Sequence, residues 1–212
     1  GTPCTPISGT CAAGMPMYSA SKTTGVNVKA DIDLSADDLL RIGALYQHYT
    51  LNDWWTPSGA MMWPNTFVNV NDGQRNRAGV FAEWESRLTR QLTTLLGARY
   101  ERVDTDTGPV SAYDNTIAPA TTLVPAFNSK DRQRADNNLD VTALARYTAS
   151  STSDVELGFS RKVRSPSLYE RYTWFSRGME MLMINWVGDG NGYIGDINLK
   201  PEKAHTLSAT FD

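Results

Sequence analysis

The feature that most constrains the fold of this chain is a period of two in its apolar residues. In residues 24–34, apolar side chains such as Val26 and Val28 alternate with polar ones such as Asn27 and Lys29, and six further stretches repeat the pattern. Successive side chains of a β-strand point to opposite faces, so each stretch is predicted to be a strand with one apolar and one polar face. The predicted strands span residues 24–34, 39–51, 76–88, 91–103, 137–148, 154–164 and 204–212.

A helix is the competing interpretation of one stretch. Between residues 78 and 103, Phe81, Trp84 and Leu88 also recur at the helical spacings of three and four. Gly97 and the β-branched threonines before it disfavour a helix. Polar and charged residues at every second position of the opposite face favour strands.

The connections between the predicted strands alternate between short and long. The short ones are residues 35–38, 89–90 and 150–153, and the long ones are residues 52–76, 104–135 and 165–202. The long connections exceed the usual loop length, and the alternation is typical of outer-membrane β-barrels. We therefore predict an all-β antiparallel meander of about seven transmembrane barrel strands with long extracellular loops, residues 1–22 forming a further such loop. A two-sheet β-sandwich with its charged faces in water is the alternative.

Composition excludes several classes of protein. The chain has 212 residues, of which 41% are hydrophobic and 20% charged, so it is not a disordered tail. Its formal net charge of −3 offers no basic field to nucleic acid, and no apolar run approaches the ~20 residues of a membrane-spanning helix. Only two histidines are present and a glycine-rich phosphate loop is absent, so we expect neither an enzyme nor a bound cofactor.

Both ends of the sequence suggest a segment of a longer chain. The N-terminus has no initiator Met and no export signal, and the C-terminus lies inside a predicted strand. Near the N-terminus, Cys4 and Cys11 are the only cysteines. In an exported protein we expect this pair to form a disulfide, whereas in the cytosol it would be two thiols or half of a metal site.

Two segments that flank the third long connection resemble a known family. One is Arg-Ser-Pro-Ser-Leu-Tyr-Glu at residues 164–170, and the other is Asp-Ile-Asn-Leu-Lys-Pro-Glu at residues 196–202. Together with residues 127–132 and 142–147, they resemble barrel segments of TonB-dependent outer-membrane receptors, and the resemblance covers residues 75–212. One departure is Asp196, where the family usually has Asn.

This resemblance implies that residues 1–212 are part of a 22-stranded β-barrel domain in the bacterial outer membrane, without its plug domain. Such a receptor takes up a scarce nutrient, such as a ferric siderophore, cobalamin or another metal complex. The energy comes from the TonB machinery, which contacts the missing plug. The implied partners are therefore the TonB machinery, a small-molecule or metal-complex ligand and outer-membrane lipid, but no nucleic acid. A passive porin and a secreted β-sandwich that binds carbohydrate are the alternatives.

The connection at residues 165–202 carries the richest set of candidate ligand-binding side chains. Arg171 and Arg177 could hold an anionic iron chelate through charge-assisted hydrogen bonds. Trp174 and Trp186 could stack on a planar ligand. Alternatively, the arginines contact solvent or lipopolysaccharide and the tryptophans pack the loops together.

The same connection contains three methionines at alternating positions, Met179, Met181 and Met183. Thioethers are soft ligands that suit Cu(I), and on an extended chain this spacing directs the sulfurs to one side. A copper-uptake receptor of the same family is therefore an alternative to uptake of an iron chelate, with the metal as transported ligand. Otherwise, the methionines fill gaps in loop packing.

Overall fold

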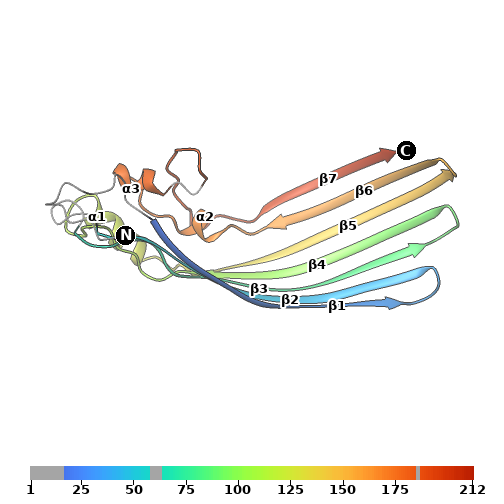
Figure 1. Ribbon diagram of the computed structural model, residues 1–212, viewed down its shortest axis with the longest axis horizontal. Coiled ribbons are helices and arrows are strands. Elements are labelled where there is room, and N and C mark those ends of the chain that lie inside the picture. The colour runs from blue at the N-terminus through green and yellow to red at the C-terminus, as the bar shows by residue number, and fades with distance from the viewer. Residues whose placement is uncertain (1–16, 58–63, 185–186) are drawn as a thin grey trace.

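The computed structural model describes residues 17–57, 64–184 and 187–212. Its strands form one antiparallel sheet in which each strand pairs with its neighbours in the sequence (Figure 1). The strands are β1 (Met17–Asp33), β2 (Asp38–Trp55), β3 (Phe67–Arg87), β4 (Leu92–Asp106), β5 (Arg134–Ser150), β6 (Ser153–Arg164) and β7 (Glu202–Phe211). The predicted meander is confirmed. The β-sandwich alternative is wrong, because the described strands make a single sheet.

The strands continue past their predicted boundaries at one end of the sheet. β1 begins at Met17 and β2 ends at Trp55, so residues 17–22, predicted to be a loop, pair with β2 instead. β3, β4 and β5 are longer in the same direction. The added residues carry polar side chains on both faces, such as Asp104 on one face and Thr105 on the other. Backbone hydrogen bonds do not depend on side-chain polarity, so the ladder continues where the alternation ends.

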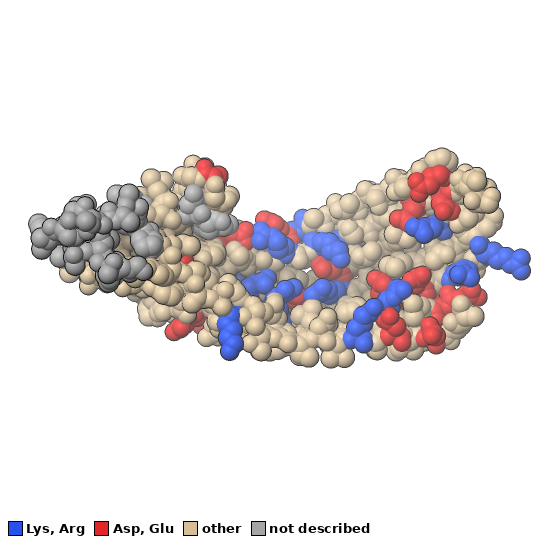
Figure 2. All heavy atoms as spheres, in the orientation of Figure 1, with Lys and Arg blue, Asp and Glu red and all other residues tan. Residues whose placement is uncertain are grey.

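The sheet has an apolar face and a polar face, as the alternation predicts. On the apolar face, Val28 and Val80 keep exposed fractions of 62% and 57%. On the polar face, Arg41 of β2 forms ion pairs across the strands with Glu83 at 2.9 Å and Glu85 at 2.8 Å. Figure 2 shows charged side chains gathered over the middle of the sheet and towards its turns.

Short and long connections lie at opposite ends of the sheet, which we call the turn end and the loop end (Figure 1). The loop end contains three short helices, α1 (Ala120–Asn128), α2 (Leu168–Tyr172) and α3 (Gly178–Met183). None of the helices in the described residues is long and apolar enough to cross a membrane.

The hydrophobic core of the described residues lies entirely at the loop end. Phe67, with an exposed fraction of 0%, is its centre. The Phe67 ring lies 5.5 Å from the rings of Trp55, Trp174 and Phe175 and 5.6 Å from that of Tyr113, centroid to centroid. The ends of β2 and β3 and the connections at residues 107–133 and 165–201 contribute to the core. Its buried members are Leu51, Trp55, Phe67, Val70, Val110, Ala112, Tyr113, Ala120, Val124, Phe127, Leu168, Tyr172, Trp174, Phe175, Ile184 and Ile197.

Candidate ligand-binding site

An ion-pair clasp closes the base of the connection at residues 165–201. Arg164 ends β6 and Glu202 begins β7 directly opposite it. The Arg164 guanidinium donates to both oxygens of Glu170 at 2.9 and 2.8 Å, and its Nε donates to Glu202 at 3.0 Å. The two segments that carry the family resemblance therefore meet in space, and we call Arg164, Glu170 and Glu202 the clasp.

Helix α2 starts at the clasp through a capping box. The backbone N–H of Glu170 donates to Ser167 Oγ at 3.2 Å, and the N–H of Ser167 donates to the Glu170 carboxylate at 2.7 Å. The Ser-Leu-Tyr-Glu sequence has the spacing that this motif requires. Hydrogen bonds from Arg164 are the main cause that lowers the pKa of Glu170 to about 2, against the opposing effect of burial.

Backbone hydrogen bonds tie the second segment to α2. The N–H groups of Gly195 and Asp196 donate to the carbonyls of Thr173 and Glu170 at 2.6 and 3.0 Å. The Asp196 carboxylate accepts from the N–H of Asn198 at 2.8 Å. Asn can accept the same bond, because Asp and Asn side chains both form turns of this kind. The departure at Asp196 therefore leaves this local structure intact.

The structure places two of the predicted ligand-binding residues beneath the loop surface. Arg171 has an exposed fraction of 2%. It donates to both oxygens of Asp136 at 2.8 Å and to Thr105 Oγ1 at 2.8 Å. Trp174 is 6% exposed, and its Nε1 donates to the Val68 carbonyl at 3.0 Å. In this conformation both side chains join loops to strands, and only a small part of the Trp174 ring remains accessible.

The other predicted site residues are less enclosed or lie outside the description. Arg177 is exposed and precedes α3. Trp186, Cys4 and Cys11 lie outside the described residues, so the disulfide stays a prediction.

The methionine segment is helical and not extended. Met179, Met181 and Met183 all lie in α3. Positions two apart in a helix differ by about 200° around its axis, so the three positions do not all lie on one side of α3. Met183 packs against the core. Among the described residues, no group of three or more His, Cys, Asp or Glu side chains could hold a metal ion.

A cleft of about 540 Å³ opens between α1 and residues 194–198, and we call it the loop cleft. Its volume lies in the range of small-molecule sites. Phe127 and Trp174 supply aromatic surface, and Lys130 and Arg134 supply positive charge. Lys130 belongs to the 127–132 segment that carries the family resemblance, but the sequence alone does not bring it near Trp174. The lining residues are Leu123, Ala126, Phe127, Lys130, Asp131, Arg134, Thr173, Trp174, Ser176, Ile194, Gly195, Asp196, Ile197 and Asn198.

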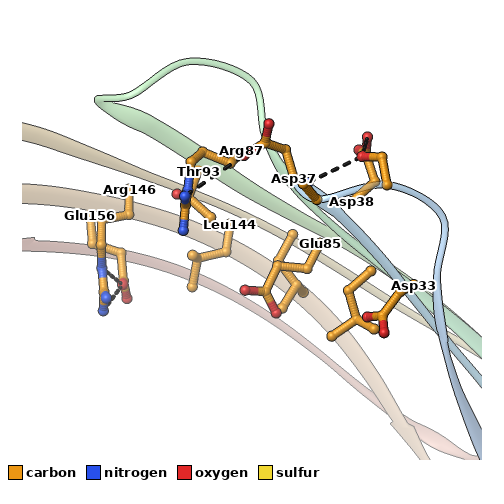
Figure 3. Close-up of a pocket in the computed structure, with 13 residues that line it drawn as sticks. Asp33, Asp37, Asp38, Glu85, Arg87, Thr93, Leu144, Arg146 and Glu156 are labelled. Carbon is orange, nitrogen blue, oxygen red and sulfur yellow. Dashed lines mark hydrogen bonds and ion pairs between the residues drawn. The ribbon is translucent and has the colours of Figure 1, made fainter.

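A second hollow, of about 500 Å³, lies on the polar face at the turn end (Figure 3). Acidic side chains outnumber basic ones along its wall. Arg146 donates to Glu156 at 2.9 Å, and Arg87 lies 3.7 Å from Asp37. The two sites therefore differ in charge: Lys130 and Arg134 of the loop cleft are balanced by Asp131 and Asp196, whereas the hollow near the turns has an acidic excess.

A family model described as TonB dependent receptor-like, beta-barrel, matches residues 8–212. The chain belongs to the TonB-dependent receptor family. A solved structure titled "Copper transporter OprC" is similar with a TM-score of 0.64 and 17% identity, over 93% of this chain and 29% of that chain. That likeness shows the fold, and this receptor segment spans less than a third of that chain. No curated protein matches.

Membership of this family accounts for the main features of the fold. TonB-dependent receptors are outer-membrane transporters and not enzymes. The antiparallel meander, the short turns at one end and the long connections at the other are those of a barrel segment.

Proposed function

We propose that this segment forms part of the wall of an outer-membrane receptor that takes up a scarce nutrient, such as a ferric siderophore or another metal complex, with energy from the TonB machinery. The apolar face contacts lipid, the polar face lines the interior of the barrel, and the loop end faces the outside of the cell. The observation that carries the proposal is the loop cleft, which lies above the polar face and combines aromatic and cationic side chains.

The dimensions of the apolar face support its assignment to lipid. On β4 the apolar side chains run from Leu92 to Tyr100, close to the about 9–11 residues with which a barrel strand crosses a membrane. Tyr46 and Tyr100 lie at the border on the loop side, and Tyr147 lies towards the turns. Barrels carry aromatic rings at both membrane interfaces. Beyond this border most outward side chains are polar, such as His48 and Arg102, which suits strand ends that emerge into water; the stacked rings of Tyr18 and Trp54 are an exception.

The cleft is the element that we propose to meet the ligand first. In place of the buried Arg171, the accessible cations are Lys130, Arg134 and the exposed Arg177. The Arg134 Nη2 already donates to Asn198 at 2.8 Å, which holds its guanidinium at the cleft wall. Trp174 contributes the part of its ring that lines the cleft.

The test uses cells that lack the intact receptor, grown under limiting iron, copper or cobalamin. We expect a growth defect under one limitation, restored by the wild-type receptor but not by a receptor with Lys130→Gln and Arg134→Gln. Arg102→Gln is the matched control, because Arg102 lies on the outward face and, among the described residues, pairs with Asp104 alone. A strain without any nutrient-dependent growth defect would contradict the proposed uptake. Full rescue by the double variant would contradict binding of the ligand in the loop cleft.

Copper uptake is the second candidate. It is supported by the three methionines of α3, of which Met179 and Met183 are one helical turn apart, and by the similarity to a solved copper transporter. Replacing Met179 and Met183 by Leu keeps apolar volume and removes both thioethers. If copper is the cargo, this double variant should lose copper accumulation while the receptor still reaches the outer membrane. Unchanged copper accumulation would remove the candidate.

A further inference from the structure

Arginines outnumber acidic residues on the polar face just below the loops. β3 supplies Arg75 and Arg77, and β4 supplies Arg99. The buried Arg171 of α2 lies beside them, because it and Arg75 both adjoin Thr105. We call Arg75, Arg77 and Arg99 the arginine patch. Among the described residues, the carboxylates of Glu101 and Asp136 pair with these four side chains, and a third carboxylate, that of Asp140, lies opposite Arg99 in the sheet.

The pairing leaves one arginine over. A single oxygen of Glu101 accepts from Arg77 at 2.7 Å and from Arg99 at 3.1 Å. Both oxygens of Asp136 are taken by Arg171. Arg75 forms neither a hydrogen bond nor an ion pair with any residue that the structure describes. The patch therefore has more positive charge than its own carboxylates neutralise.

Several guanidinium N–H groups of the patch also lack acceptors. The Nε atoms of Arg75 and Arg77 are shielded from solvent and have no hydrogen-bond partner among the described residues. A buried donor without an acceptor is costly, and crowding like charges adds to the cost. A guanidinium matches the geometry of carboxylate and phosphate oxygens. An oxyanion on the patch would offset the charge and accept hydrogen bonds from the Nη groups of Arg75, which have no partner among the described residues and, unlike Nε, are not shielded from solvent.

The patch lies directly below the loops that line the loop cleft. A Cβ at Gly73 would lie 3.1 Å from Leu168 Cδ1, so α2 rests on β3 two residues before Arg75. Figure 2 shows blue side chains, with red ones among them, over the middle of the sheet. A ligand that leaves the loop cleft for the interior of the barrel would pass the patch.

From the unpaired Arg75 and the surplus of arginines over carboxylates we infer that the arginine patch binds an anionic group of the transported ligand, a carboxylate or phosphate group or the face of an anionic metal chelate. This inference rests on the proposed function, because it requires the polar face to be the ligand's route. It narrows the cargo to negatively charged ligands.

The test measures binding by isothermal titration to the purified intact receptor. The probes are iron(III) citrate, an anionic chelate, and an uncharged iron(III) trihydroxamate. We expect iron(III) citrate to bind, to bind more weakly at high salt, and to lose about tenfold or more in affinity in Arg75→Gln. Arg75→Lys keeps the positive charge but loses the planar guanidinium, so its affinity for iron(III) citrate should lie between those of the wild type and Arg75→Gln. Arg102→Gln, on the outward face at a similar height, should leave the affinity unchanged.

Three results would overturn the inference. Iron(III) citrate could fail to bind or bind no better than the uncharged chelate, or its affinity could be the same in Arg75→Gln. The third result would be that Arg75→Gln lowers the melting temperature of the receptor without changing its affinity for the anion. This would show that Arg75 pairs with another part of the receptor. Uptake itself is tested separately, by growth of the deletion strain. A receptor that imports only uncharged ligands would therefore contradict anion binding by the arginine patch but agree with the proposed function.

Discussion

The turn end and the loop end of the sheet bury apolar surface in different ways. At the loop end, side chains from strands and loops cover one another, and Phe67 is fully enclosed by four aromatic neighbours. Towards the turns, the protein covers neither face, and residues such as Val80 and Leu157 stay more than half exposed. The loop end thus has a buried core like that of a water-soluble protein. The strands below it have an apolar face that the protein does not cover, as suits contact with lipid.

This difference explains why the strands are longer than the apolar alternation. Below Tyr100 the outward side chains must match lipid, and above it they must match water. The inward side is polar in both parts until the loops fold over it. One hydrogen-bonded ladder therefore passes through two environments, and only one of them leaves a period-two signal in the sequence.

The largest expected effect separates the two regions by a single type of substitution. Phe67→Ala should destabilise the loop end by about 3–5 kcal/mol, because it opens a cavity among aromatic rings that cannot fully collapse. Phe159→Ala, on the apolar face, should cost clearly less, because lipid chains can occupy the space. The measurement is urea unfolding of the intact receptor in lipid vesicles, combined with proteolysis of the loops. Equal losses at the two positions would mean that Phe159 is enclosed by protein.

A charge placed on the sheet tests the second region. Leu96→Lys should cost about 2–4 kcal/mol if the residue faces the middle of the bilayer. Leu95→Lys, the neighbouring position on the polar face, should cost much less. Both free energies come from the same vesicle unfolding assay. If the two variants unfold alike, the assignment of the two faces is wrong.

The sequence predicted the parts of the fold that repeat and missed those that depend on distant contacts. Strand number, order and facing follow from alternation, which is local. The burial of Arg171 does not, because its partner Asp136 is 35 residues away and nothing in the sequence pairs them. The loop cleft likewise joins Lys130 to Trp174 from two different connections. Loop packing is set by tertiary contacts, so residue type alone suggested an exposed site where the structure has a core.

A smaller effect is expected at the start of α2. Ser167→Ala removes the side-chain acceptor of the capping box and should lower the stability of the connection by about 1 kcal/mol. Ser208→Ala, on the exposed polar face of β7, should change stability by less than about 0.5 kcal/mol. The measurement is hydrogen exchange of the α2 amides in both variants. Unchanged protection in Ser167→Ala would show that the tertiary contacts of Leu168 and Tyr172 hold the helix without its cap.

The smallest effect concerns the clasp and depends on pH. The pKa of Glu170 is lowered from the ordinary value of 4.5 to about 2, with hydrogen bonds from Arg164 as the main cause. A carboxylate with a lowered pKa stabilises the folded state above the unfolded-state pKa, and this contribution is lost as pH falls from 4.5 towards 2. Proteolysis of the loop should therefore speed up within that window, measured with an acid-stable protease.

Arg164→Gln shows whether the clasp causes that dependence. Half of the Arg164 side chain is exposed, so its loss should cost only about 0.5–1 kcal/mol at pH 6. Without the guanidinium, the pKa of Glu170 rises towards its ordinary value, and the acid sensitivity of the loop should flatten. Arg146→Gln removes a comparable ion pair with Glu156 near the turns and should leave the pH profile of the loop unchanged. If wild type and Arg164→Gln lose loop protection along the same pH curve, the acid sensitivity arises elsewhere, and the two motif segments are held together by their backbone hydrogen bonds and not by the clasp.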